Sequence, residues 1–337
     1  MAEPLLRVQG LTKHFSSARA RRGPAAVADV SFAIDPGETL GLVGESGCGK
    51  STLARLILHL LAPDAGNVTL AGVDFTGADA ALRRRLRRKV QIVFQDALSS
   101  LNPRMTAGVN IAEPMRLQGL GTLAERTAAA HEMLELVGLR AEDAERYPHE
   151  FSGGQCQRIA IARALVLRPE LIVFDEAVSA LDVSIRAQIL RLIMDLQQRF
   201  GLAYLFISHD LSVVRRISSR IAVMYLGRIV ELAPADAVCL RPQHPYTEAL
   251  LRAIPIPDPR RMRVESLGIL SEDAPSLEAA PSGCAFHQRC GHRMAVCAQS
   301  RPELLETAPE RAVACFLHQT ASAPTVQGAP QRASAAT

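Results

Sequence analysis

The chain alternates short apolar runs with longer amphipathic segments. Apolar runs of strand length occupy residues 5–8, 31–34 and 39–43, and the last of them leads into a glycine-rich turn. Two later runs, residues 171–174 and 203–207, are apolar at every position. A parallel strand that is covered on both faces has this pattern, because neither face meets water. These runs therefore predict a buried, mainly parallel sheet.

Helical periodicity separates these predicted strands. STLARLILHLL, which begins at Ser51, is apolar and of helical length, and Pro63 follows it. Residues 183–200 place Ile185, Ile189, Leu192, Ile193 and Leu196 on one face and stop at Gly201. Residues 96–167 are mostly helical with Gly and Pro breaks, which predicts a helical subdomain inserted between strands. Strands that alternate with helices indicate an α/β fold.

The amino-acid composition of the sequence changes near residue 235. Beyond it prolines cluster in IPIPDPR, several cysteines follow, and the last segment is rich in Ala, Ser, Thr and Pro. We therefore expect a large α/β unit over residues 1–235, a smaller C-terminal extension over 236–319 and a disordered tail over 320–337.

Composition and charge exclude several classes of protein. No apolar run approaches the roughly 18 residues of a transmembrane helix, and the N-terminus lacks the pattern of a secretion signal. The net charge of +4 is too small to argue for nucleic acid. An arginine-rich run covers residues 83–89, but no interleaved aromatic residues supply a stacking surface, which favours a solvated helix face over a nucleic-acid site.

The strongest chemical signal is GESGCGKST, which matches the phosphate-loop pattern G-x-x-x-x-G-K-[ST]. An apolar strand precedes it and an amphipathic helix follows it, as this loop requires. Glycines let successive backbone N–H groups point at phosphate oxygens, and the helix N-terminus favours negative charge. Lys50 would reach the β- and γ-phosphates, and Ser51 would bind Mg²⁺. The predicted nucleotide-binding residues of this loop are Gly44, Glu45, Ser46, Gly47, Cys48, Gly49, Lys50, Ser51 and Thr52.

A second carboxylate site follows the apolar strand in LIVFDE, residues 171–176. Asp175 is predicted to hold Mg²⁺, and Glu176 is placed to orient or deprotonate an attacking water. Alone, this pattern is commonplace. Downstream of a phosphate loop it indicates nucleotide hydrolysis.

A phosphate loop followed by an acidic strand end could belong to a nucleotide kinase, a GTPase or a helicase. The segment FSGGQCQRIAIARAL, which begins at Phe151, decides between these classes. Here the chain resembles the ABC ATPase family, whose signature is Ser-Gly-Gly-Gln at the start of a helix. The resemblance implies that the signature of one subunit closes on the ATP bound by its partner, head to tail. It assigns this role to Ser152, Gly153, Gly154 and Gln155.

The resemblance covers roughly residues 5–235 and implies roles for further positions. Gln95 would sense Mg²⁺ and the attacking water, and His209 would contact the γ-phosphate. Asp182, in SALD, would communicate across the dimer, and Phe15 is the best candidate for stacking on adenine. The implied fold is a P-loop NTPase core with an N-terminal antiparallel β subdomain and a helical signature subdomain.

Four other stretches are similar to ATP-binding subunits of bacterial oligopeptide and dipeptide importers: SSLNPRMT, YPHEFSGGQ, DEAVSALDVS and HPYTEALL. This similarity implies an ATPase that drives peptide import as the F-type partner of a D-type ATPase subunit, in a head-to-tail heterodimer. It also implies two transmembrane permease subunits, an extracytoplasmic peptide-binding protein and a peripheral place on the cytoplasmic face of the bacterial inner membrane.

Two alternatives to peptide import stay open. The same machinery could import a nickel chelate or glutathione. A soluble ABC ATPase acting on nucleic acid or ribosomes is less favoured, because the chain has a single cassette without a coiled-coil or zinc insertion.

Four of the seven cysteines lie near the C-terminus, at Cys284, Cys290, Cys297 and Cys315. Their spacing is neither the paired C-x-x-C of a zinc ribbon nor a ferredoxin run, so spacing alone leaves metal binding and scattered buried thiols equally open. The nearby histidines His287, His292 and His318 keep Zn²⁺ as an alternative. Similarity to the importer extension implies a [4Fe-4S] cluster held by the four cysteines, with a structural or redox role.

Overall fold

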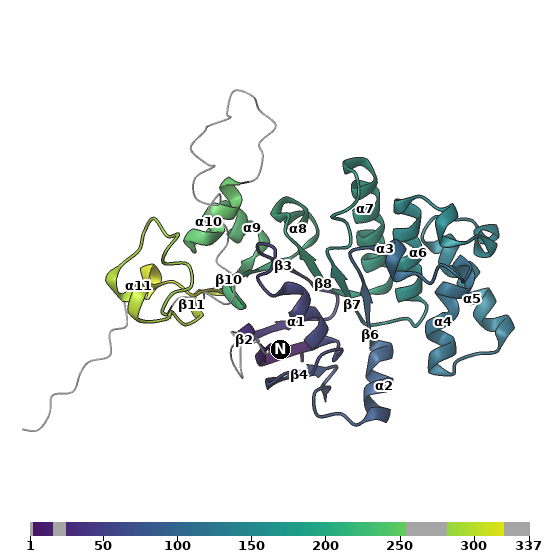
Figure 1. The fold of residues 1–337 in the computed structure, drawn as a ribbon, viewed down its shortest axis with the longest axis horizontal. Helices are drawn as coiled ribbons and strands as arrows, with labels where there is room; N and C mark the ends of the chain where they lie inside the picture. The colour runs from purple at the N-terminus through teal and green to yellow at the C-terminus, as the bar shows by residue number, and fades with distance from the viewer. Residues whose placement is uncertain (1–2, 16–24, 254–281, 320–337) are drawn as a thin grey trace, which may run out of the picture.

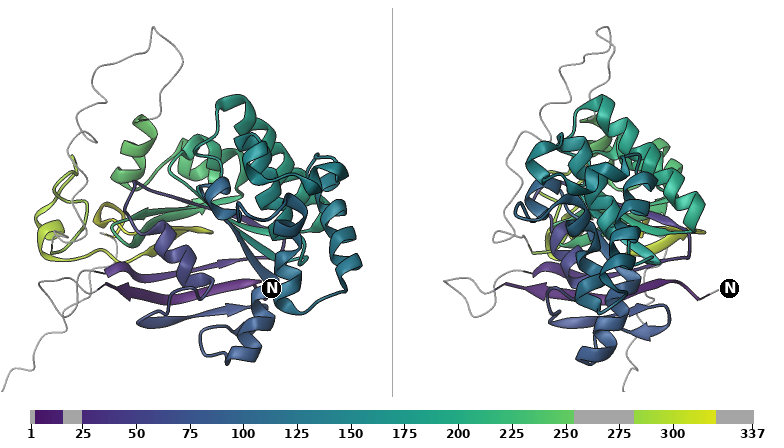
Figure 2. Two further views of the ribbon diagram at one scale, coloured as in Figure 1. Left: turned by 45° about the vertical axis from the view of Figure 1, so that its right-hand side comes forward. Right: turned by 90° about the vertical axis from the view of Figure 1, so that its right-hand side faces the viewer.

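The computed structural model describes residues 3–15, 25–253 and 282–319. Two stacked β-sheets form the body of the molecule, with a helical layer at one end and the C-terminal segment at the other (Figures 1 and 2). The expected disordered tail, residues 320–337, lies outside the described residues.

The N-terminal sheet is antiparallel, with strand order β2-β1-β4-β5. β1 pairs with β2 so that Leu6 lies opposite Ile34, and both of these side chains are buried. The strands predicted over residues 5–8 and 31–34 are present but longer than the apolar runs. They extend because backbone pairing continues past the last strongly apolar residues. The bounds are β1 Leu6–His14, β2 Ala25–Ile34, β4 Ala65–Leu70 and β5 Val73–Asp74.

The core sheet has the strand order β11-β12-β10-β9-β3-β8-β7-β6. The five strands β9, β3, β8, β7 and β6 are parallel to one another. Beyond β9 the sheet continues with β10, β12 and β11, and each of these is antiparallel to its neighbour. The parallel strands are β3 Thr39–Val43, β6 Val90–Val93, β7 Leu171–Asp175, β8 Ala203–Ser208 and β9 Arg220–Tyr225. The antiparallel strands are β10 Arg228–Pro234, β11 Leu305–Ala308 and β12 Arg311–Val313.

The core sheet buries both of its faces, as the uninterrupted apolar runs predicted. Along β8, Tyr204 and Phe206 face an apolar cluster under the helices, while Leu205 and Ile207 face a second cluster shared with the N-terminal sheet. Successive side chains of a strand point to opposite faces, so an apolar residue at every position supplies two cores at once. The carboxyl ends of β3, β7 and β8 therefore sit at the rim of a rigid, fully packed layer.

Within residues 3–15, 25–253 and 282–319, ten α-helices and short 3₁₀ turns surround the two sheets, and one further α-helix lies in the C-terminal segment. The helices over the sheets are α1 Lys50–Ile57, α2 Ala80–Lys89, α7 Val183–Phe200, α8 Leu211–Ile217, α9 Ala235–Leu240 and α10 Pro245–Arg252. The helical layer contains α3 Ala97–Ser100, α4 Ala107–Gln118, α5 Leu123–Leu136 and α6 Gly153–Leu165, with 3₁₀ turns at Ala141–Glu145 and Pro148–Glu150. The C-terminal segment contains α11 Ala295–Gln299 and a 3₁₀ turn at Phe316–His318.

The arginine-rich run forms α2, a surface helix that buries only Leu86. Arg84 and Arg87 donate hydrogen bonds to backbone oxygens of Leu117 and His59, and Lys89 pairs with Glu170 at 2.9 Å. This is the solvated helix face that the sequence favoured.

The C-terminal segment continues the core sheet through β12 and β11, two strands that sequence reasoning missed. These strands are short and carry few apolar residues, so they have no strong period-two signal. Across residues 3–15, 25–253 and 282–319, no helix is both long enough and apolar enough to span a bilayer.

Candidate functional site

The loop between β3 and α1 is shaped by glycines that no other residue could replace without strain. Gly49, the residue that caps α1, has φ of 110°, and a Cβ there would lie 2.2 Å from the Ala26 oxygen. At Gly44 a Cβ would meet the Met224 oxygen at 2.2 Å. The loop can therefore wrap tightly against β2 and β9.

Lys50 lies across this loop with its side chain only 4% exposed. Its ammonium donates hydrogen bonds to the Gly44 oxygen at 2.8 Å and the Glu45 oxygen at 3.0 Å. It also lies 3.7 Å from the Glu176 carboxylate. A positive charge thus sits at the mouth of the loop, where phosphate would enter.

Ser51 and Asp175, the two predicted Mg²⁺ ligands, meet at the end of β7. The Ser51 hydroxyl donates to an Asp175 carboxylate oxygen at 3.0 Å. Burial raises the pKa of Asp175, and the Ser51 hydrogen bond acts against that rise. A hydroxyl and a carboxylate oxygen form the hard-oxygen pair that Mg²⁺ accepts beside water and phosphate, so these residues fit that ion.

Glu176 is the point on which the predicted catalytic residues converge. One carboxylate oxygen lies 3.3 Å from Gln95 Nε2 and 3.4 Å from His209 Nδ1, while the other lies 3.7 Å from Lys50 Nζ. The Glu176 backbone has φ of 51°, a left-handed conformation that side chains rarely adopt, and its N–H bonds to the Ile207 oxygen at 3.0 Å. Such strain is typical of functional sites, where the surrounding structure holds it. Three residues that are far apart in sequence, Lys50, Gln95 and His209, therefore converge on one carboxylate.

The signature residues lie elsewhere, at the start of α6 in the helical layer, which is separate from α1 in Figure 1. Ser152 caps the helix: Gln155 N–H donates to its hydroxyl at 3.3 Å, and Ser152 N–H donates to the Gln155 side chain at 2.9 Å. Ser152 and Gly153 are exposed. A Cβ on Gly154 would lie 2.6 Å from an Ile185 methyl, so the helix needs a glycine to approach α7.

Two further predicted residues, Phe15 and Asp182, are exposed. Phe15 follows β1 with 48% of its surface exposed, so its ring is accessible. Asp182 is exposed at the N-terminus of α7 and makes no capping hydrogen bond there.

The structure reveals two partners of the phosphate loop that the sequence did not indicate. Glu45 N–H donates to the Tyr246 hydroxyl at 2.9 Å, and the Glu45 carboxylate accepts two hydrogen bonds from Arg289, each 3.0 Å long. Arg289 lies 244 positions along the chain from Glu45. No local pattern could have joined them, because both contacts depend on how the C-terminal segment packs.

The four C-terminal cysteines border one small cavity of about 10 Å³, together with His287 and His292. Cys284 N–H bonds to the Cys297 oxygen at 2.8 Å, which closes the segment on itself. Burial raises the pKa of the Cys315 thiol to about 11. Within the described part of the chain, no group of three or more His, Cys, Asp or Glu side chains is arranged to hold a metal ion.

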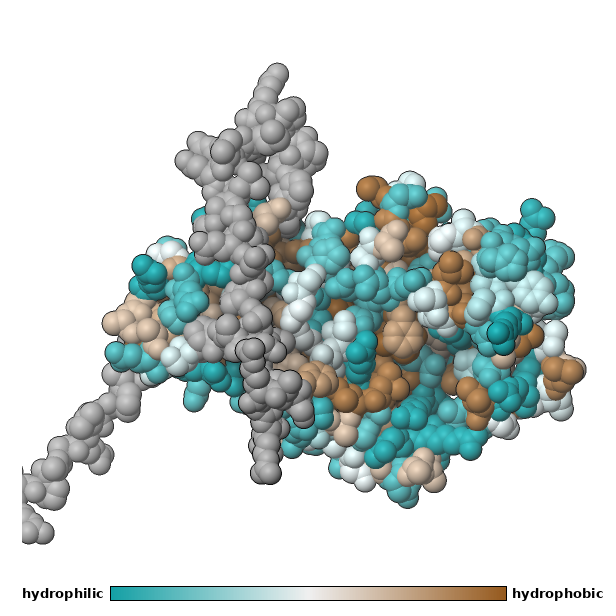
Figure 3. Space-filling model, viewed as in Figure 1, coloured by the Kyte–Doolittle hydropathy of each residue, from teal (hydrophilic) through white to brown (hydrophobic). Residues whose placement is uncertain are grey.

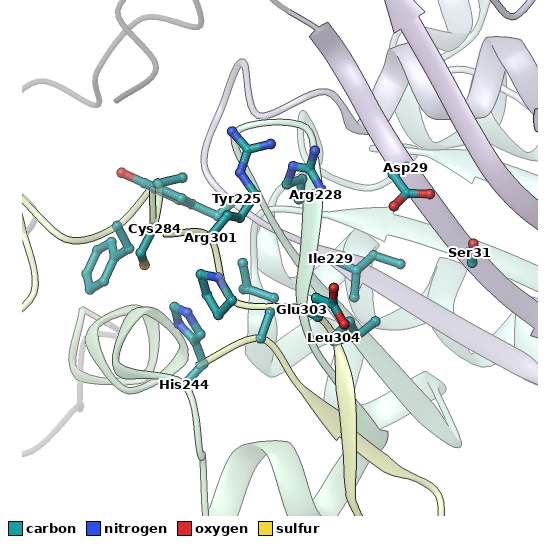
Figure 4. A pocket seen from close by; sticks show the side chains of 15 residues that line it. Asp29, Ser31, Tyr225, Arg228, Ile229, His244, Cys284, Arg301, Glu303 and Leu304 are labelled. Carbon is teal, nitrogen blue, oxygen red and sulfur yellow. The ribbon is translucent and has the colours of Figure 1, made fainter. Parts of the chain in front are cut away.

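A larger pocket of about 520 Å³ opens between β2, β10 and the C-terminal segment (Figure 4). Arg228 and Arg301 line it, but so do Asp29 and Glu303. Both signs of charge therefore lie on its wall.

Two regions of the chain match known protein families. Residues 27–179 match the family model described as ABC transporter, and residues 230–297 match the model of the oligopeptide/dipeptide transporter C-terminal region. A probable peptide ABC transporter ATP-binding protein of Sinorhizobium fredii is 52% identical over 96% of this chain and 92% of its own length. The chain belongs to the ABC transporter ATP-binding family. It is therefore an ATPase of the ABC type.

A further relative and a solved structure are also similar to this chain. The putative oligopeptide transport ATP-binding protein YkfD of Bacillus subtilis is 49% identical over 94% of this chain and 97% of its own length. Among solved structures, a dimeric ATP-binding cassette in a post-hydrolysis state, bound to ADP and Pi, is 30% identical. It matches with a TM-score of 0.62 and covers 68% of this chain and 98% of its own. The P-loop fold expected from the sequence is thereby confirmed.

Proposed function

We propose that this ABC ATPase is the F-type subunit that couples ATP hydrolysis to peptide import through a membrane transporter. The convergence of Lys50, Gln95 and His209 on the Glu176 carboxylate carries the catalytic part of the proposal. The relatives named as peptide and oligopeptide transport proteins, and the matching C-terminal region, support the choice of peptides.

The geometry suggests a role for each residue in hydrolysis. Lys50 pairs with the β- and γ-phosphate oxygens, since its ammonium already crosses the loop. Ser51 and Asp175 would hold Mg²⁺, with the Gln95 amide near the same shell, and the ion when bound neutralises phosphate charge. Glu176 accepts a proton from the attacking water, and His209 contacts the γ-phosphate from the adjacent strand end.

The exposed signature supports a head-to-tail pair of ATPase subunits. Ser152 and Gly153 are exposed at the start of α6, a helix that lies apart from α1 in Figure 1, so they are available to a partner's nucleotide. The 30% identical cassette bound to ADP and Pi is described as dimeric. We infer a D-type ATPase as the partner, with Asp182 at the boundary between the two subunits.

A cleft of about 580 Å³ between α2, α4 and the start of the helical layer supports the attachment of a permease. Arg84, Gln91, Asn102, Glu113 and Leu117 line it. Apolar side chains nearby are exposed, among them Leu98 at 52% and Val109 at 48%, and Figure 3 shows hydrophobic residues scattered over this end of the molecule. We infer that one permease subunit docks a helix on this cleft, and that a second permease subunit docks in the same way on the partner ATPase. This attachment places the ATPase peripherally on the cytoplasmic face of the inner membrane. An extracytoplasmic binding protein then selects the peptide.

The decisive experiment replaces the proposed base. In Glu176→Gln, turnover should fall about 10²–10⁴-fold, because the amide cannot accept the proton, while ATP binding persists. Glu170→Gln, which alters an exposed carboxylate paired with Lys89, serves as the control and should keep full turnover. Turnover in Glu176→Gln above a tenth of the control would refute the assignment. Peptide uptake by vesicles containing the complete transporter, compared with uptake of a nickel chelate and glutathione, tests the solute.

We further infer that Cys284, Cys290, Cys297 and Cys315 hold a [4Fe-4S] cluster, with Zn²⁺ as the alternative. Their thiols line one cavity, and four thiolates are the donor set of such a cluster, although the four side chains as they stand are not arranged to hold a metal ion. No step of ATP hydrolysis passes through it. Broad visible absorption that dithionite bleaches, and that each Cys→Ser variant loses, would support the cluster. Anaerobically purified protein that is colourless and contains only zinc would refute it.

A further inference from the structure

The phosphate loop contains a carboxylate that would oppose its own ligand. Glu45 is the second residue of the loop, and its backbone oxygen lies 3.0 Å from Lys50 Nζ. Its side chain is only 20% exposed. A polyphosphate in this loop is strongly negative, so an uncompensated carboxylate here would weaken its binding through like-charge repulsion in a poorly solvated place.

Arg289 compensates that charge with the geometry of a strong ion pair. Its two terminal nitrogens donate to the two Glu45 oxygens at 3.0 Å each, and its side chain is only 5% exposed. A bidentate guanidinium–carboxylate pair fixes orientation as well as charge. The Glu45 side chain is thereby turned toward the C-terminal segment.

The segment that carries the cysteines holds Arg289 in place. Arg289 immediately precedes Cys290, and its guanidinium carbon lies 5.8 Å from the ring centroid of Phe286. Phe286 is 2% exposed and packs edge-on against Tyr225, with ring centroids 5.4 Å apart. Arg289 also donates to the Tyr225 hydroxyl at 3.3 Å.

Tyr246 fixes the same part of the loop from a second side. Its hydroxyl accepts the Glu45 N–H at 2.9 Å, and its ring lies 4.5 Å from that of Tyr225 and 5.4 Å from that of Phe286. Backbone and side chain of one loop residue are thus both anchored to elements after residue 240.

We propose that Arg289 is a positioning residue for the nucleotide site: it cancels the Glu45 charge and lets the C-terminal cysteine segment set the affinity for ATP. The structure of that segment then controls ATP binding through one ion pair, without contact between the cysteines and the nucleotide. Loss of the segment's fold would release Arg289 and leave the carboxylate facing phosphate.

The test is a charge cycle on the full chain, with steady-state ATPase kinetics and direct binding of a fluorescent ATP analogue. Arg289→Gln should raise KM for ATP and the Kd of the analogue about tenfold, with kcat changed less than about threefold. Added salt should reduce the rise in KM and Kd caused by Arg289→Gln, since salt screens the repulsion between the Glu45 carboxylate and the phosphates. The Arg289→Gln/Glu45→Gln double variant should bring both constants back to within about twofold of Glu45→Gln alone, because the carboxylate is gone.

Two further variants distinguish the loss of charge compensation from a loss of folded structure. Arg293→Gln removes an exposed arginine of the same segment and should leave KM unchanged. Arg289→Lys retains the charge without the bidentate fork and should raise KM less than Arg289→Gln does. If the double variant is as defective as Arg289→Gln, or if Lys is as harmful as Gln in a chain with unchanged circular dichroism, Arg289 is a structural residue and the proposal fails.

Discussion

Glu231 is a fully buried carboxylate that joins the C-terminal segment to the core, and its replacement by glutamine should be strongly destabilising. Its side chain is 0% exposed. One oxygen accepts the Gln243 N–H at 2.9 Å and Arg311 Nη2 at 3.0 Å, and the other accepts the His244 N–H at 3.0 Å. One side chain of β10 thus links the segment that leads into α10 with β12.

Glu231→Gln keeps the shape but turns one acceptor into a donor. Whichever way the amide is rotated, its NH₂ group faces a backbone N–H or the guanidinium, and Arg311 loses its charge partner. A hydrogen bond to a charged group contributes about 1.5–3 kcal/mol, and breaking a buried ion pair costs about 3–5 kcal/mol. Because these figures describe overlapping interactions, we expect a loss of about 3–5 kcal/mol in the free energy of unfolding.

Urea unfolding followed by circular dichroism measures the global loss, and hydrogen exchange of residues 240–253 measures the local one. Glu248→Gln, on α10, is the matched control: its carboxylate is 41% exposed, and its pair with Arg252 should contribute little. If Glu231→Gln loses less than about 1 kcal/mol, or no more than the control, the buried carboxylate does not hold this junction.

Three further predictions concern the nucleotide site. Gly49→Ala should weaken ATP binding at least about tenfold in a fluorescent-analogue titration, because φ of 110° and the Ala26 oxygen exclude a Cβ; unchanged affinity would contradict this. Phe15→Ala should weaken ATP binding about tenfold in the same titration while Phe15→Tyr retains it, and equal losses would argue against stacking. Burial raises the pKa of the Cys48 thiol, so at pH 8 iodoacetamide should label Cys48 much more slowly in the folded chain than in urea, as mass spectrometry will show.

Much of this protein could be predicted from local pattern. The phosphate loop, the acidic strand end and the signature are each contiguous, because a loop that cradles phosphate or a helix start that receives it needs its residues side by side. The apolar runs at residues 171–174 and 203–207 were likewise sufficient to predict β7 and β8, since a parallel strand that is covered on both faces is apolar at every position. The solvated face of α2 was predicted because no aromatic residues are interleaved in its arginine run.

Tertiary structure alone decided how these pieces meet. The strands β11 and β12 are short and weakly apolar, and they form because β10 offers a free edge and Glu231 a buried partner for Arg311. The convergence of Gln95 and His209 on Glu176 depends on the packing of three strands. The pairing of Glu45 with Arg289 joins residues 244 positions apart, and the four cysteines come to border one cavity for the same reason. A local sequence specifies what a segment can bind, but burial and the matching of charges across distant segments determine which groups stand within bonding distance.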